Sequence, residues 1–395
     1  MTWTDRVAKR LAAWCGLAAA LAGCGGGEHG TTGPDSTAAG VRLVATVPVP
    51  ANYGQHDQFV RAGLAFLCSW NTGLQIYDVG DGRAGGSPQN PQLISRVVTA
   101  GGETHNAWWY WAPDGQKRYV FVGQEGPGAI GSSSSGDIHV VDVSNLSAPV
   151  EVASYHMAGA GTHNFWVDET NQILYAAYYN GGVVALDVSG TLSGDLAGRE
   201  ISRIQPGGAG NTYVWGVMLS NGSLYATDML SGFWQLALSN DTLRVVAGGN
   251  NVPERYGSDQ WVANGYAYSG TWGTRAGVLG NAVKIWKLGA TGAPVLHDSI
   301  VTPGFTTVSD VQVSADNRML VFSGEYGPQA GIYFYSLVAD PGHPAFIAYY
   351  PVITNNQNGI HTVTVSDIGG RRYVFAAEDP PSPAMLVLDV TAISP

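Results

Sequence analysis

Residues 104–143 contain the pattern that decides the fold. They begin with Thr104-His105-Asn106, continue after a turn with Tyr119-Val120-Phe121-Val122, and end with Ile138-His139-Val140-Val141-Asp142-Val143. The same order recurs along the chain. The first residues of the seven openings are His56, His105, His163, Trp215, Ser258, Ser309 and His361. They are separated by 49, 58, 52, 43, 51 and 52 residues, a spacing typical of a repeat array.

Each repeat contains signals for four β-strands. The opening begins a first strand, and an aromatic-rich second strand follows it, as at residues 64–67 and 373–376. A third strand ends with Asp-Val before Ser, Gly or Thr, as at residues 183–188, which indicates a strand end and a turn. A fourth strand, such as residues 150–155, precedes the next opening. The sequence therefore predicts an all-β protein, a seven-bladed β-propeller.

The strand signals also predict how the propeller closes. The last repeat offers only three strands, whereas residues 41–47 form a strand signal without a repeat of their own. We expect this N-terminal strand to be the outer strand of the last blade, because closure removes exposed sheet edges. Residues 41–395 would then form one propeller domain.

One repeat resembles a known family. Residues 138–145, Ile-His-Val-Val-Asp-Val-Ser-Asn, followed by Ser147-Ala148-Pro149, are similar to the LVIVD-repeat propellers of bacterial exported proteins. The resemblance covers residues 41–395 and implies the propeller fold and an exported lipoprotein, but no particular activity. Repeats four to six depart from the family pattern, since Trp and Ser replace the histidine and some third strands lack the Asp-Val ending.

The N-terminal segment predicts export. Three basic residues precede an apolar stretch at residues 11–22, and Leu21-Ala22-Gly23-Cys24 resembles a bacterial lipobox. We expect residues 1–23 to be a signal peptide, Cys24 to be the lipidation site, and residues 24–40 to include a flexible tether. The protein would then belong to the bacterial cell envelope, lipid-anchored to the outer or inner membrane. An ordinary cleaved signal that happens to precede a cysteine is the alternative.

Composition narrows the range of partners. The formal net charge of −11 at pH 7 disfavours nucleic acid and anionic lipid surfaces. We expect membrane contact through the lipid anchor only, and a monomer. Cys68 is the single cysteine within the propeller, so no disulfide framework is expected, and its place in a second strand predicts a buried, inert thiol.

Antiparallel order places the seven openings at one mouth of the central channel. The start of each first strand and the end of each second strand share a face, where the longest loops gather. His361, His56, His105 and His163 come from four consecutive blades of a closed ring, so we expect a continuous arc of histidines. The polar residues expected to bind ligand beside them are Asp57, Asn106, Asn164, Asp259, Asp310, Glu125, Glu325 and Glu378.

The histidine arc admits two interpretations. Neutral imidazoles beside carboxylates are suitable ligands for Zn, Cu, Mn or Fe, which would make His56, His105, His163 and His361 a metal site. Alternatively, the histidines bond to backbone or Asp/Asn neighbours and tie the blades together. The Gly-x-Ser-x-Gly and His-Glu-x-x-His signatures are absent, so the sequence names no catalytic residue.

Three functions are compatible with these features. We expect a binding or interaction module that uses its loop-rich face to bind a protein or a small molecule. The alternative is a metal-dependent enzyme with the histidine cluster at the channel mouth, in which Glu125, Asp259 or Asp310 is a ligand or general base. A purely structural envelope protein is the third possibility.

Overall fold

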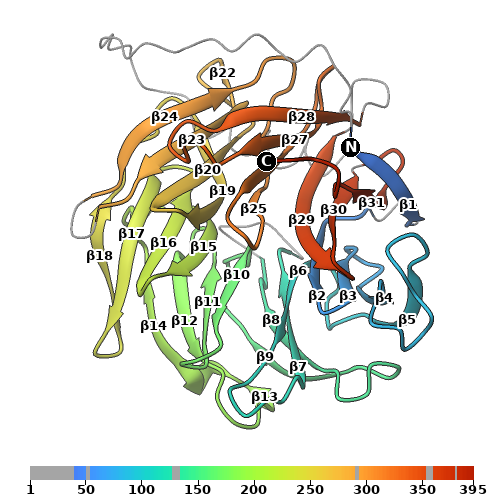
Figure 1. Cartoon of the computed structure of the whole chain (residues 1–395). Coiled ribbons are helices and arrows are strands. Elements are labelled where there is room, and N and C mark those ends of the chain that lie inside the picture. Colours follow the sequence, from blue (N-terminus) through green and yellow to red (C-terminus); the bar gives the residue numbers. More distant parts are fainter. Residues whose placement is uncertain (1–39, 50–53, 127–133, 290–292, 353–358, 379) are drawn as a thin grey trace. The chain divides into compact units, whose positions relative to one another are not determined.

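Seven antiparallel sheets surround a central channel in the computed structural model (Figure 1). The structure describes residues 40–49, 54–126, 134–289, 293–352, 359–378 and 380–395. These residues belong to one compact unit that spans Gly33–Pro395. The expected signal peptide, Cys24 and all of the tether except Gly40 lie outside the described residues. The predicted all-β, seven-bladed propeller is confirmed.

The innermost strand of each blade lines the channel, and the later strands follow outwards. Blade 1 contains β2 (Asp57–Arg61), β3 (Leu64–Cys68), β4 (Leu74–Asp78) and β5 (Gln92–Val97). Blade 2 contains β6 (Thr104–Tyr110), β7 (Tyr119–Gln124), β8 (Ile138–Asp142) and β9 (Val150–Tyr155). Blade 3 contains β10 (Phe165–Asp168), β11 (Ile173–Ala177), β12 (Val183–Asp187) and β14 (Glu200–Ile204).

The other four blades follow the same plan. Blade 4 contains β15 (Val214–Ser220), β16 (Ser223–Asp228), β17 (Gly232–Ser239) and β18 (Thr242–Gly248). Blade 5 contains β19 (Tyr256–Ala263), β20 (Tyr266–Trp272), β23 (Ala282–Lys287) and β24 (Val295–Val301). Blade 6 contains β25 (Val311–Val313), β26 (Met319–Gly324), β27 (Gly331–Ser336) and β28 (Ala345–Pro351). Blade 7 contains β29 (Ile360–Ile368), β30 (Arg371–Glu378), β31 (Ala384–Asp389) and β1 (Arg42–Pro48).

The ring closes through β1, as the sequence predicts. This strand pairs antiparallel with β31, from Arg42 opposite Asp389 to Pro48 opposite Ala384. In Figure 1 the blue β1 lies beside the red strands of blade 7. The pairing gives the outer edge of β31 a hydrogen-bonded neighbour and joins the two ends of the domain in one sheet.

The Asp-Val strand endings have a local physical cause. In each of four blades the aspartate side chain accepts a hydrogen bond from the backbone N–H two residues further on, which fixes the turn that leaves the strand. The bonds are Gly80 to Asp78 (2.9 Å), Ser144 to Asp142 (2.9 Å), Ser189 to Asp187 (2.8 Å) and Thr391 to Asp389 (3.1 Å). The repeated motif therefore encodes a turn.

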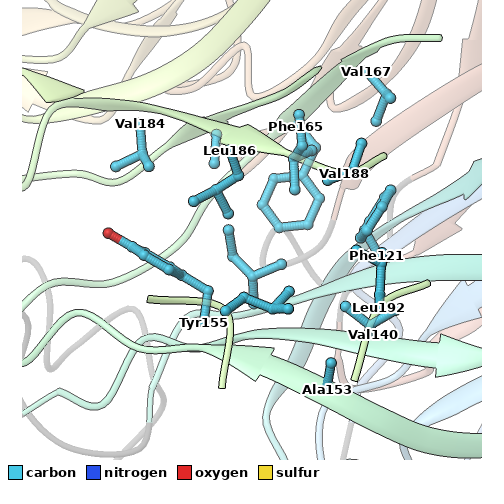
Figure 2. Packing of buried hydrophobic residues seen from close by; sticks show 14 of the residues in the cluster. Phe121, Val140, Ala153, Tyr155, Phe165, Val167, Val184, Leu186, Val188 and Leu192 are labelled. Carbon is cyan, nitrogen blue, oxygen red and sulfur yellow. The ribbon is translucent and has the colours of Figure 1, made fainter. Parts of the chain in front are cut away.

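The hydrophobic core is divided among the interfaces between blades. In one cluster, Phe121 and Val140 of blade 2 pack with Phe165 and Leu186 of blade 3 (Figure 2). None of these side chains is more than 6% exposed. Full burial of one such side chain stabilises the fold by about 1.5–3 kcal/mol. The apolar residues of the repeats therefore hold neighbouring blades together. Cys68 in β3 is fully buried, as predicted.

A few short elements depart from the simple repeat. β13 (Gly194–Asp195) adds a fifth strand to blade 2, parallel to β9, although it follows the third strand of blade 3. The 3-10 helix η1 (Ala197–Arg199) comes directly after it. β21 (Thr274–Arg275) and β22 (Val278–Leu279) form a hairpin in the loop of blade 5. Within the part of the chain that the structure describes, no helix has the length and apolar character needed to cross a bilayer.

Candidate metal centre in the central channel

β-Bulges mark the openings of several first strands. The pairing register shifts between Thr104 and Asn106 in β6, and similar shifts occur at the openings of β15, β19 and β29. A bulge bends the strand and redirects its side chains. The opening residue and the residue after it are then no longer held on opposite faces of the sheet. The histidine rings contact one another. Most of the residues that come directly after the opening residues line the channel wall.

The four predicted histidines form a continuous arc. The distance between ring centroids is 4.2 Å from His361 to His56, 3.9 Å from His56 to His105, and 4.2 Å from His105 to His163. The ring of Trp215, from the next blade, lies 4.1 Å from that of His163. None of the histidines is more than 6% exposed. Four consecutive blades therefore place four imidazoles in one buried row.

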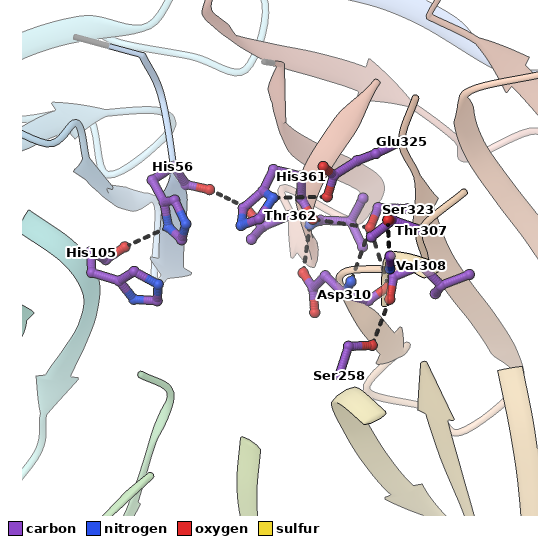
Figure 3. A network of polar contacts seen from close by, with 12 residues as sticks. His56, His105, Ser258, Thr307, Val308, Asp310, Ser323, Glu325, His361 and Thr362 are labelled. Atoms are coloured by element: carbon purple, nitrogen blue, oxygen red, sulfur yellow. Dashed lines mark hydrogen bonds and ion pairs between the residues drawn. The ribbon is translucent and has the colours of Figure 1, made fainter. Parts of the chain in front are cut away.

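One hydrogen bond fixes the tautomer of His56. Its Nδ1 atom lies 3.1 Å from the backbone carbonyl oxygen of His105 (Figure 3). A carbonyl oxygen only accepts, so Nδ1 carries the proton and donates. The lone pair is then on Nε2, which is buried and has no hydrogen-bond partner among the described residues. His361 is held differently, with its Nδ1 2.8 Å from Oε1 of Glu325.

Glu125 faces the histidines from the end of β7. The hydroxyl group of Tyr179 donates to its Oε1 atom over 2.5 Å. Its Oε2 atom lies 3.9 Å from Nε2 of His105 and has no hydrogen-bond partner in the described structure. One ligand atom each from His56, His105 and Glu125 lie within 4.8 Å of one another. Two imidazole nitrogens and a carboxylate oxygen thus converge.

Burial sets the charge of this cluster. It lowers the pKa of His56, His105 and His163 well below the ordinary value, and the neighbouring histidines lower these pKa values further. The three imidazoles are therefore neutral at neutral pH, which is the form that binds metals. Burial also raises the pKa of Glu125 to about 8 and that of Asp57 to about 7.

A layer of polar side chains lies beside the histidines in the channel. Asp57, Asn164, Asp259 and Asp310 line a cavity of about 220 Å³. The side-chain amide of Asn164 donates to Asp259 over 2.9 Å, and the Val363 N–H donates to Asp310 over 2.6 Å. Asp259 and Asp310 share a hydrogen bond, and burial raises the pKa of both.

The remaining predicted residues differ in their placement. Asn106 lines the cavity and Glu325 contacts His361. Glu378, at the end of β30, is not among the described residues that line the cavity, and burial raises its pKa. Part of the predicted loop-rich face, at residues 50–53, 127–133, 353–358 and 379, lies outside the described residues.

Sequence reasoning missed two features of the channel. Tyr179 was not singled out, because its role depends on a contact with Glu125 in the neighbouring blade. The sequence also does not tell which tryptophans pack within the blades and which face a ligand, and Trp108, Trp166 and Trp261 line the cavity. Each of the three stands two residues after a polar channel residue, and this alternation was the available signal.

Fold and site together define a seven-bladed β-propeller with a buried cluster of histidines and carboxyl groups in its channel. No protein-family model matches the sequence, and no curated protein is similar to it. The fold is similar to the WD40 β-propeller domain of Doa1, with a TM-score of 0.58 and 11% identity over 88% of this chain and 97% of that domain. It is also similar to the computationally designed Ika8 protein, with a TM-score of 0.51 and 10% identity over 84% of this chain and 82% of that one.

Proposed function

We propose that this propeller is a binding module whose ligand is a divalent transition-metal ion, held at the histidine end of the channel. The supporting observation is a set of buried donor atoms without hydrogen-bond partners among the described residues. They are Nε2 of His56, Nε2 of His105 and Oε2 of Glu125. They come from two neighbouring blades, and the three residues each have one ligand atom within 4.8 Å of the others.

The geometry of the donors suits an ion such as Zn, Cu, Mn or Fe. Ligand atoms about 2.0–2.1 Å from a tetrahedral ion are roughly 3.3 Å apart. One ligand atom of each of the three residues already lies within 4.8 Å of the others, so the donors need to approach by only about 1.5 Å to coordinate one ion. Nδ1 of His163 is also buried without a partner in the described structure, and its ring lies 4.2 Å from that of His105, so we propose this histidine as the fourth ligand. His361 supports the cluster through Glu325.

The unpartnered atoms favour a bound ion over purely structural histidines. A buried polar atom without a partner costs about 1–3 kcal/mol. His105 has two such ring nitrogens, although it is fully buried. If the histidines served only to tie blades together, their nitrogens would be expected to hold hydrogen bonds. Metal coordination would satisfy the same atoms.

Metal analysis tests the proposal directly. Protein purified without a histidine tag should contain, or take up, about one metal ion per chain at neutral pH. His105→Ala and Glu125→Gln should each lower this content, whereas His156→Ala, at an exposed histidine, should not. All proteins should carry His297→Ala and His343→Ala, because these rings form a second pair 4.7 Å apart that could take up metal. The protein that carries only these two changes keeps the channel histidines. If it is folded and binds no Zn, Cu, Mn or Fe, the proposal is contradicted.

A second candidate is a metal-dependent enzyme. His56 and the proposed fourth ligand His163 line the channel cavity, so an ion that they bind would face a space that a small molecule can occupy. In that case the metal would keep an exchangeable coordination position. Azide added to the Cu(II)-loaded protein should then change its electron paramagnetic resonance spectrum. An unchanged spectrum would favour a closed site.

The proposed setting is the bacterial cell envelope. The lipobox-like Leu21-Ala22-Gly23-Cys24 supports attachment through lipid on Cys24, and residues 25–40 provide a tether. The similarity of residues 138–145 to LVIVD repeats supports the same setting. Binding of a protein partner by the loop-rich face stays a prediction from the sequence.

A further inference from the structure

We propose that the channel cavity next to the histidines binds a compact organic ammonium ion, with the carboxyl groups receiving its N–H groups and tryptophans covering its apolar part. This site shares the channel with the proposed metal ion but uses other residues. It does not require the metal, so the two proposals can fail separately.

The charges in the cavity call for a cation. Asp57, Asp259 and Asp310 all line it. Uncharged groups of the protein donate hydrogen bonds to them. The Gln58 N–H donates to Asp57 over 2.7 Å, the Asn164 amide donates to Asp259, and the Val363 N–H donates to Asp310. Among the lining residues that the structure describes, there is no lysine or arginine. A carboxylate that is ionised in such a buried place needs a cation beside it, and a bound ammonium ion would supply one.

Two residues that line the cavity also carry buried polar atoms without hydrogen-bond partners in the described structure. The Nε2 atom of Gln260 donates to the Tyr225 carbonyl oxygen over 2.7 Å, which fixes the amide orientation. The Oε1 atom of Gln260 then has no hydrogen-bond partner in the described residues, although the residue is only 3% exposed. Ser309 Oγ is in the same state at 2% exposed. Both residues line the cavity, and an amide oxygen can only accept, so a ligand that reached this oxygen would have to donate a hydrogen bond to it.

The next layer of the channel is aromatic. Phe59, Trp108, Trp166 and Trp261 each stand two residues after Asp57, Asn106, Asn164 and Asp259, so strand alternation turns both layers towards the channel. The ring centroids are 5.1 Å apart from Phe59 to Trp108, 5.2 Å from Trp108 to Trp166, and 6.1 Å from Trp166 to Trp261. These four side chains are partly exposed. Tryptophan faces attract cations and also cover apolar groups.

Size and chemistry together define the ligand class. A space of about 220 Å³ is small and suits a compact amine. A neutral polyol could use the same acceptors and stack on tryptophan, but only an ammonium ion is attracted to the ionised form of the carboxyl groups. The cavity therefore favours a primary amine with a short apolar group.

Matched probes separate charge from shape. Benzylamine and benzyl alcohol have the same number of non-hydrogen atoms, and only the amine is cationic. Isothermal titration of metal-free wild-type protein at neutral pH should show benzylamine binding roughly tenfold or more tightly than benzyl alcohol. Glucose serves as the neutral polyol. Equal affinities for amine and alcohol, tighter glucose binding, or no measurable amine binding would each overturn the inference.

Variants locate the site. Asp259→Asn and Trp166→Leu should each weaken benzylamine binding by roughly tenfold, and Trp166→Phe should restore part of it. Asp298→Asn, on the outer strand of the same blade, and Trp111→Leu, a tryptophan that stacks on Arg61 and Lys117, are the controls. If a channel variant does not fold, the wild-type comparison of amine and alcohol still decides. Metal titration of the same preparation reports on the metal site alone.

Discussion

The Nδ1–H group of His56 donates to the backbone carbonyl oxygen of His105, 3.1 Å away. This bond crosses from blade 1 to blade 2, so the neighbouring blade determines which nitrogen of His56 can bind a ligand. In ordinary metal sites a second hydrogen bond of this kind orients the imidazole and fixes its tautomer. Backbone geometry therefore leaves the lone pair of His56 on Nε2, the atom that we propose as a metal ligand.

The first prediction concerns the pH dependence of stability. Burial raises the pKa of Glu125 from 4.5 to about 8. Between these values the unfolded chain has lost the proton that the folded state keeps, so the stability of the metal-free protein falls as pH rises. Glu125→Gln removes this loss. At about 1.4 kcal/mol per pKa unit, we expect the variant to be more stable than wild type at pH 8 by a few kcal/mol.

Urea denaturation of the chelator-treated proteins at pH 4.5 and pH 8 measures this difference. At pH 4.5 the two proteins should be similar, because Glu125 is protonated in the folded wild type. Burial also raises the pKa of Asp57, to about 7. Both proteins should therefore still lose some stability as the pH rises. Identical pH profiles for wild type and variant would refute the prediction.

The second prediction assigns a positioning role to Tyr179. Its hydroxyl group stabilises the ionised form of Glu125 by donating to Oε1, so Tyr179→Phe should raise the pKa of Glu125 further. A metal ion would then displace a more tightly held proton. We expect zinc affinity at pH 7 to fall roughly 10- to 100-fold and the pH of half-saturation to rise.

A matched control distinguishes this effect from loss of packing. Tyr155 donates to Oε2 of Glu200 over 2.5 Å, a similar tyrosine–glutamate pair that does not contact the histidines. Tyr155→Phe should leave zinc affinity unchanged. If both tyrosine variants bind zinc like wild type, Tyr179 does not tune the site.

The third prediction concerns closure of the ring. Deleting residues 41–49 removes β1, exposes the edge of β31 and uncovers apolar side chains such as Met385 and Val387. We expect a loss of several kcal/mol and a large drop in melting temperature. Deleting residues 25–39 instead should leave the melting temperature nearly unchanged. Equal melting temperatures for the two deletions would argue against closure through β1.

The fourth prediction concerns membrane attachment. If Cys24 is acylated, the mature protein should partition with membranes, and Cys24→Ser should abolish the modification. Mass spectrometry of the mature N-terminus measures the modification, and membrane fractionation gives the independent readout. An unmodified Cys24 at the N-terminus of mature protein would exclude the lipid anchor.

The sequence was sufficient for the fold and for the histidine arc. Equivalent openings of a closed repeat array must lie side by side, so the order of repeats along the chain predicts that His361, His56, His105 and His163 are neighbours. The Asp-Val endings are equally readable, because each aspartate bonds to a backbone N–H only two residues away. The place of the N-terminal strand at residues 41–47 is also readable, because only the last repeat lacks a fourth strand.

The tertiary structure alone decided the chemistry of the channel. Three of its contacts join residues of different blades. They are the hydrogen bonds between Tyr179 and Glu125, between His56 and the His105 carbonyl oxygen, and between Asn164 and Asp259. Their geometry depends on bulges, blade tilt and ring radius, which no short sequence pattern encodes. β13 could not be predicted for the same reason. Its two residues form a strand only because they pair with the edge of β9 in the neighbouring blade. Short-range hydrogen bonds and periodicity can be read from a sequence, whereas the distances between blades are set by packing of the whole ring.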